Sequence, residues 1–276
     1  MNEKTARNYG IDALRIVSML MIVTLHINGQ GGVMWTVEVH SLRWCIVWLG
    51  EIASMCSVNC YAMISGYVGG STHRHYTNFV MLWLQVAFYT VGITALFAWL
   101  SPEKVGQEQW RNAFLPVTTR QYWYFTAYAI MYLFVPVFDA AIEKLSKRQF
   151  QMMLAVLLAI GSILPTIFNI DPIGLKGGYN AWWLMILYLL GGYVGKYKPC
   201  RKIGNRYLIV GFIVAIGTTW ICWRLFHDTA YNIVGFDGMI SYTAPLILLA
   251  SICILLLFSK MKIGGGATYR CSVLFP

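Results

Sequence analysis

Three ionisable residues in the first apolar stretch constrain this chain more than any other feature. Asp12, Arg15 and His26 interrupt a hydrophobic run that is otherwise typical of a membrane-spanning helix. An arginine at the centre of a span costs roughly 2.5–3.5 kcal/mol on insertion scales, so a chain keeps one where a partner or a ligand offsets that cost. We therefore interpret these residues as a functional polar path through the membrane.

Helical spacing places the three residues on one stripe. His26 follows Arg15 by eleven residues, which leaves the two side chains about 20° apart around the helix and about 16 Å apart along it. Asp12 precedes Arg15 by one turn. Histidine exchanges a proton near neutral pH, which suits a general base. The alternative is an ion pair between Asp12 and Arg15 at one membrane interface, with His26 at the opposite boundary.

Composition predicts an all-α, polytopic bundle of transmembrane helices. Hydrophobic residues make up 58% of the 276 residues, charged residues only 12% and aromatic residues 15%, which excludes an ordinary soluble domain. Eight apolar segments are long enough to suggest spans, although the sixth is short. They are expected at 11–28, 44–69, 78–100, 122–138, 150–168, 182–195, 207–226 and 239–259.

Basic residues orient these spans. Lys4 and Arg7 precede the first segment, and the densest basic run lies between Lys196 and Arg206. By the positive-inside rule the N-terminus is predicted to be cytoplasmic, in a plasma membrane. The net charge of +10 then lies mostly on the cytoplasmic side, where anionic lipid headgroups satisfy it and no nucleic-acid partner is needed. Asp12 and Arg15 interrupt the first segment, so it is interpreted as a retained span rather than a signal peptide.

Cysteine and histidine usage predicts no metal site and no disulfide framework. The seven cysteines include no CxxC pair, and Cys56 and Cys60 are expected to pack in the core. His73 and His75 have no carboxylate or cysteine nearby in the sequence, which disfavours a metal site there.

Small and aromatic residues predict close helix packing and interface anchoring. The GxxxG spacing from Gly191 to Gly195 allows two helices to approach closely. Ser65 and Gly66 form another small pair, which lets a helix or a ligand approach the backbone. Tyr122 and Trp123 begin a span on the outer side, where amphipathic rings favour the membrane interface.

These motifs together resemble the acyltransferase 3 family of integral-membrane acyltransferases. The first-span sequence from Ile11 to Val17, ending at His26, is similar to that family's Arg-x10-His signature. The run Val58-Asn59-Cys60-Tyr61-Ala62-Met63-Ile64-Ser65-Gly66-Tyr67 is similar to its second signature. Further similarity lies in the fourth and sixth spans, at Tyr122-Trp123-Tyr124-Phe125, Tyr128, Tyr132, Pro136 and 189–195.

The resemblance implies transfer of an acyl group, often acetyl, from acyl-coenzyme A on the cytoplasmic side to a hydroxyl of an envelope carbohydrate or a similar acceptor. It implies that His26 is the catalytic base and that Arg15 binds the coenzyme or polarises the thioester. Asp12 would orient Arg15, while Ser65, Tyr122 and Trp123 would support the site. An extended pantetheine arm would bridge the gap between Arg15 and His26.

The chain departs from the family pattern after Lys262. Family members have about ten spans, whereas 263–276 are too few to cross a bilayer. We therefore expect an incomplete acyltransferase-3-like transmembrane domain at 1–262 and an atypical tail, which reads as frame-shifted, at 263–276. The loop after the second span has His73-Arg74-His75 and is lighter in arginine than in the family. Three alternatives stay open: an inactive fragment of the enzyme, a transporter or flippase, and a non-catalytic membrane module.

Overall fold

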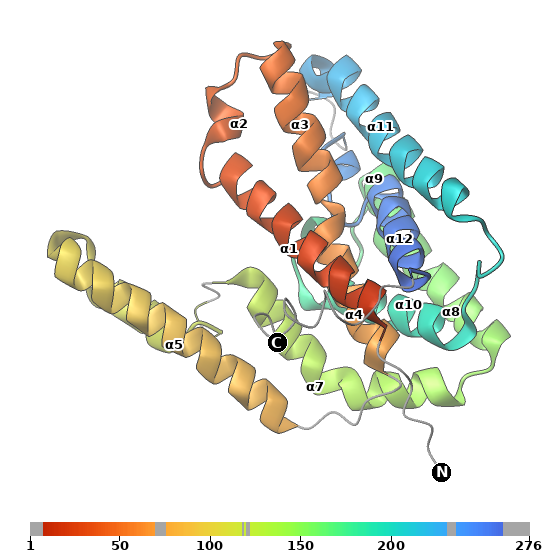
Figure 1. Cartoon of the computed structure of the whole chain (residues 1–276), viewed down its shortest axis with the longest axis horizontal. Helices are drawn as coiled ribbons and strands as arrows, with labels where there is room; N and C mark the ends of the chain where they lie inside the picture. The colour runs from red at the N-terminus through yellow and green to blue at the C-terminus, as the bar shows by residue number, and fades with distance from the viewer. Residues whose placement is uncertain (1–7, 70–75, 118, 120–121, 231–235, 262–276) are drawn as a thin grey trace.

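The computed structural model describes residues 8–69, 76–117, 119, 122–230 and 236–261. The expected all-α class is confirmed. Throughout these ranges the regular structure is helical, joined by turns and short 3-10 segments (Figure 1). The helices are α1 (Tyr9–Asn28), α2 (Val33–Thr36), α3 (Leu42–Ser54), α4 (Cys56–Gly69), α5 (Tyr76–Leu100), α6 (Gln107–Phe114), α7 (Trp123–Lys144), α8 (Lys147–Leu158), α9 (Leu164–Phe168), α10 (Ala181–Tyr197), α11 (Asn205–Ala230) and α12 (Pro245–Ser259).

Helices α4 and α10 form the central pair of the bundle, with the most extensive contact between any two helices. Glycines make this approach possible. A Cβ atom at Gly66 would lie 1.8 Å from the Tyr188 carbonyl oxygen, and one at Gly191 would lie 1.9 Å from the Met63 carbonyl oxygen. The predicted close packing at Ser65-Gly66 and at the GxxxG spacing is therefore confirmed, because only glycine allows such short backbone distances.

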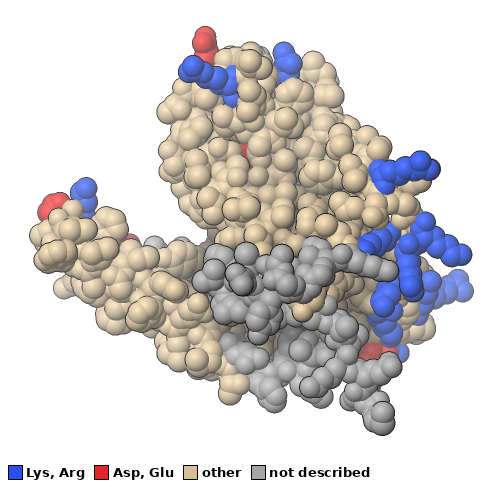
Figure 2. Space-filling model, in the orientation of Figure 1, with Lys and Arg blue, Asp and Glu red and all other residues tan. Residues whose placement is uncertain are grey.

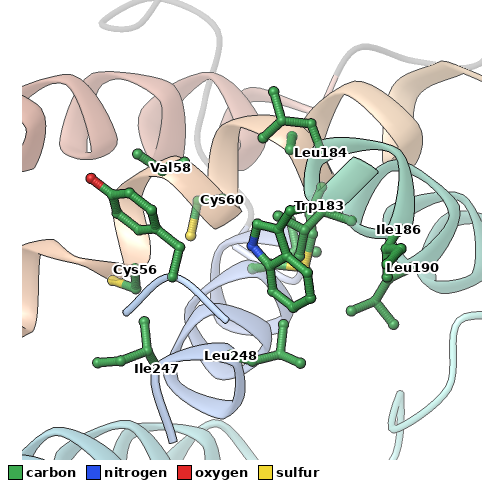
Figure 3. Close-up of a cluster of buried hydrophobic side chains, with 14 of the residues drawn as sticks. Cys56, Val58, Cys60, Trp183, Leu184, Ile186, Leu190, Ile247 and Leu248 are labelled. Carbon is green, nitrogen blue, oxygen red and sulfur yellow. The ribbon is translucent and has the colours of Figure 1, made fainter. Parts of the chain in front are cut away.

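Other helices surround this pair. Helices α1 and α12 pack on α4, α7 packs on α10, and α11 packs on α12 and α3. Figure 3 shows the core where α4, α10 and α12 meet, with Cys56 and Cys60 on α4; the Cys56 sulfur points away from Trp183. Both cysteines are completely buried, which confirms that they are packed core residues.

Six helical segments are long and apolar enough to cross a membrane: Tyr9–Asn28, Leu42–Gly69, Phe79–Leu100, Trp123–Lys144, Lys147–Phe168 and Asn205–Phe226. They correspond to six of the eight expected spans. The sixth and eighth coincide with α10 and α12, which have 17 and 15 residues. The chain is thus a multi-pass membrane protein.

Four expected spans differ in detail from the structure. The second span is divided at Met55 into α3 and α4, and a π-helical segment (Ala159–Ile163) joins α8 to α9 in the fifth. The eighth begins at Pro245 instead of residue 239 because Ala244 is extended, as the residue before a proline usually is. In the fourth, the helix continues through Pro136 to Lys144.

One end of the bundle is strongly basic. The blue side chains at the right of Figure 2 gather where α7, α8, α10, α11 and α12 begin or end (Figures 1 and 2). This basic end consists of Lys144, Lys147, Arg148, Lys196, Lys198, Arg201, Lys202, Arg206 and Lys260. In contrast, α5 stands apart from the bundle, and only 6% of its apolar segment within Phe79–Leu100 is buried.

The first and last described helices are joined at their ends. Asn8 caps α1 by accepting a hydrogen bond from the Gly10 N–H, and its Nδ2 donates to the Ser259 carbonyl oxygen at 2.9 Å. Gly10 lies against α12, where a Cβ atom would be 2.0 Å from the Phe258 carbonyl oxygen. This junction holds the N-terminus of α1 against the C-terminal end of α12.

Candidate functional site

Asp12 and Arg15 form an ion pair in the first half of α1. The Arg15 Nη1 atom donates to Asp12 Oδ1 at 2.8 Å. The Asp12 side chain is 6% exposed, whereas the Arg15 side chain is 42% exposed. The buried carboxylate therefore holds the guanidinium, whose side chain remains partly exposed. The pairing that both interpretations of the sequence required is present.

Helix α4 supports the backbone of α1 beside this pair. The Tyr61 hydroxyl donates to the Arg15 carbonyl oxygen at 2.9 Å. Ser65, one turn later, donates through Oγ to the Tyr61 carbonyl oxygen at 3.2 Å. Ser65 thus bonds within its own helix, and its neighbour Gly66 makes the close contact with α10.

The stripe between Arg15 and His26 is apolar. Met19 and Ile22 occupy the intermediate turns on the same azimuth; Met19 is exposed and Ile22 is partly exposed. The turns between the two ends of the predicted polar path are therefore hydrophobic. A polar group lies at each end of a hydrophobic track, because Ser18, the nearby polar residue, turns inward and is completely buried.

His26 lies near the C-terminus of α1 with an exposed side chain. Its Nδ1 atom is 2.7 Å from the Ile22 carbonyl oxygen. A carbonyl can only accept, so this bond requires the proton on Nδ1 and leaves the lone pair on Nε2. Helix α1 ends two residues later, where the Gly31 N–H donates to the His26 carbonyl oxygen at 2.8 Å. The imidazole is thereby held in the tautomer that a general base needs.

Two polar residues that the sequence interpretation missed lie close to His26. Asn28, the last residue of α1, is buried, and its Nδ2 donates to Glu51 Oε2 on α3 at 3.1 Å. The Glu51 carboxylate is partly buried and lies within electrostatic range of His26. The sequence did contain a signal that could have identified Glu51: like Asp12 and Arg15 in the first span, it is an ionisable residue within an apolar segment.

Tyr122 and Trp123 lie at the start of α7, on the same end of the bundle as the C-terminus of α1. Tyr122 is the N-cap residue and is 44% exposed. Trp123 stacks on Tyr242, with ring centroids 5.8 Å apart, and contacts Tyr179 at 4.7 Å. Trp123 thus belongs to an aromatic cluster with Tyr179 and Tyr242, whereas Tyr122 is placed at the start of α7.

A comparison with family models decides the identity. Residues 8–267 match the model described as an acyltransferase domain, which covers nearly the whole chain. This protein belongs to the acyltransferase 3 family. Neither the curated proteins nor the solved structures contain a match.

The candidate site is elongated. Arg15 and His26, separated by about 16 Å along α1, do not meet at one atom, so each would contact a different part of any shared ligand. His73, Arg74, His75 and the tail at 263–276 lie outside the described residues. Within the described ranges, no group of three histidine, cysteine or acidic side chains is placed to hold a metal.

Proposed function

We propose that this protein transfers an acyl group, most simply acetyl, from acyl-coenzyme A to a hydroxyl of a cell-envelope carbohydrate. Membership of the acyltransferase 3 family supports the reaction class. The observation that carries the assignment of the base is the hydrogen bond from His26 Nδ1 to Ile22, which leaves Nε2 able to accept a proton on an exposed surface.

Arg15 is the proposed donor-binding residue. Its guanidinium is oriented by Asp12 and is partly exposed, and a guanidinium fork suits the oxygens of a phosphate or a carbonyl. The basic end of the bundle lies beyond it and would attract the anionic coenzyme. We place this end, and with it the N-terminus, on the cytoplasmic side of the plasma membrane, where basic residues are retained.

The apolar track between the two residues fits the donor's arm. Met19 and Ile22 offer a hydrophobic surface, and an extended pantetheine chain matches the separation of about 16 Å. With the phosphates near Arg15, the thioester would lie near His26. This arrangement would let both residues act on one donor molecule without touching each other.

His26 Nε2 would then accept the proton of the acceptor hydroxyl as its oxygen attacks the thioester carbonyl. A new C–O bond forms, the C–S bond breaks, and the coenzyme leaves as a thiolate. The imidazolium returns its proton to that thiolate, which restores the neutral base. The products are the O-acylated acceptor and free coenzyme A, so no other reactant is required.

The test is transfer of label from acetyl-coenzyme A to envelope glycans in membranes that contain this chain. We expect His26→Ala to reduce transfer by at least about a hundredfold, within the range for loss of a general base. His40→Ala is the matched control, since His40 is also an exposed histidine but precedes α3. Transfer at the wild-type rate by His26→Ala would refute the assigned base, and no transfer by the wild-type chain would refute the proposed function.

A further inference from the structure

The Glu51 carboxylate has a position that the proposed chemistry leaves unexplained. Two other carboxylates in the apolar helices have strong hydrogen-bond donors. Asp12 accepts a hydrogen bond from the Arg15 guanidinium, and Asp139 accepts one from the Tyr188 hydroxyl at 2.5 Å. Among the residues that the structure describes, Glu51 has no Lys or Arg partner and receives a hydrogen bond from the Asn28 amide. A partly buried charge without a cation is costly inside a membrane protein.

The Glu51 side chain lies beside the C-terminal turn of α1. Helix α3 packs on α1, and the 3.1 Å bond joins residues 23 positions apart in the chain. Among the residues that the structure describes, Glu51 interacts electrostatically with His26 from α1 and with Tyr242 from the segment before α12. Of these, His26 is the group that becomes a cation during the proposed reaction.

We propose that Glu51, held by Asn28, is a positioning residue that stabilises the positive charge developing on His26 during acyl transfer. This inference rests on the proposed function. Glu51 takes no proton: the proton moves from the acceptor hydroxyl to His26 Nε2 and later to the coenzyme thiolate. The Ile22 carbonyl orients the His26 ring through its hydrogen bond with Nδ1. Glu51 has a different role: it supplies the negative charge that stabilises the His26 imidazolium.

Two substitutions of Glu51 separate charge from hydrogen bonding. Glu51→Gln keeps the length of the side chain and can still accept from Asn28, but it removes the charge. Glu51→Asp keeps the charge on a side chain one methylene shorter. We expect Glu51→Gln to lower kcat about 10- to 30-fold with KM changed by less than about twofold, and Glu51→Asp to retain more activity.

Glu38→Gln is the matched control, because Glu38 is an exposed carboxylate at the same end of the bundle. It should transfer at the wild-type rate. A merely structural role for Glu51 would give the opposite order, with the isosteric Glu51→Gln better than Glu51→Asp. That order, or wild-type kcat in Glu51→Gln, would overturn the inference.

A second measurement does not depend on acyl transfer. Diethyl pyrocarbonate is attacked by the neutral imidazole of exposed His26, which carries positive charge until ethyl carbonate has left and the Nδ1 proton is lost, so Glu51→Gln should slow modification by about three- to tenfold at pH 8. Mass spectrometry of the peptide that contains His26 follows the rate. If Glu51→Gln is modified more slowly than the wild-type chain but the wild-type chain transfers no acyl group, the Glu51 effect stands and the proposed function is rejected. Equal modification of the two chains would reject the Glu51 effect.

Discussion

A methyl group added at Gly191 would test the central helix pair directly. Its Cβ atom would lie 1.9 Å from the Met63 carbonyl oxygen and 2.7 Å from the Met63 carbonyl carbon. These are backbone atoms, so no side-chain rotation relieves the overlap. Helices α4 and α10 would have to separate by roughly 1 Å, which opens the most extensive contact in the bundle. We expect Gly191→Ala to cost about 3 kcal/mol, the upper part of the range for overpacking.

This cost corresponds to a fall of about 5–10 °C in apparent melting temperature for a chain of this size. A thiol-reactive fluorophore in detergent measures it, because Cys56 and Cys60 are fully buried and become reactive when the bundle opens. Gly217→Ala on α11 is the control: nothing lies within 4 Å of its added Cβ atom, so alanine should be neutral or stabilising. An equal melting temperature for Gly191→Ala and Gly217→Ala would refute the close approach of α4 and α10.

Two further predictions concern single side chains. Asn59→Ala should destabilise the fold by about 2–4 kcal/mol, measured by the same fluorophore. The substitution leaves the buried Tyr242 carbonyl and the Trp183 indole N–H without the partners that Asn59 provides at 2.8 and 2.9 Å; an unchanged melting temperature would contradict this. Arg15→Lys keeps the charge opposite Asp12 but loses the guanidinium fork, so the KM for acetyl-coenzyme A should rise about tenfold with little change in kcat. Unchanged KM would remove Arg15 from donor binding.

The fold class and the ends of the site followed from the sequence because their signals are local. Apolar segments predict helices. The spacing of eleven residues fixes the relative positions of Arg15 and His26 on one helix, whatever packs around it. Glu51 stood within an apolar segment as visibly as Asp12 did. Its relation to His26 depends on how α3 packs on α1, and helical spacing within one segment contains no information about that packing.

Hydropathy also fails to separate buried helices from exposed ones. The α5 window from Phe79 to Leu100 and the α11 window from Asn205 to Phe226 have the same mean hydropathy of 1.8, yet 6% of the first and 28% of the second are buried. In a membrane protein, lipid satisfies an apolar surface as well as another helix does. Contact with neighbours therefore depends on small residues such as Gly66 and Gly191 more than on hydrophobicity.

The bond between Asn8 and Ser259 sets an order of events during synthesis. It joins residues 251 positions apart, and a ribosome adding about 5–20 residues per second needs roughly 10–50 s to make that interval. Helix α1 is thus made long before it completes its contacts with α12. During this time α1, with its ion pair, lies in the membrane without α12, and the contacts of Asn8 and Gly10 form only when the end of α12 has been translated.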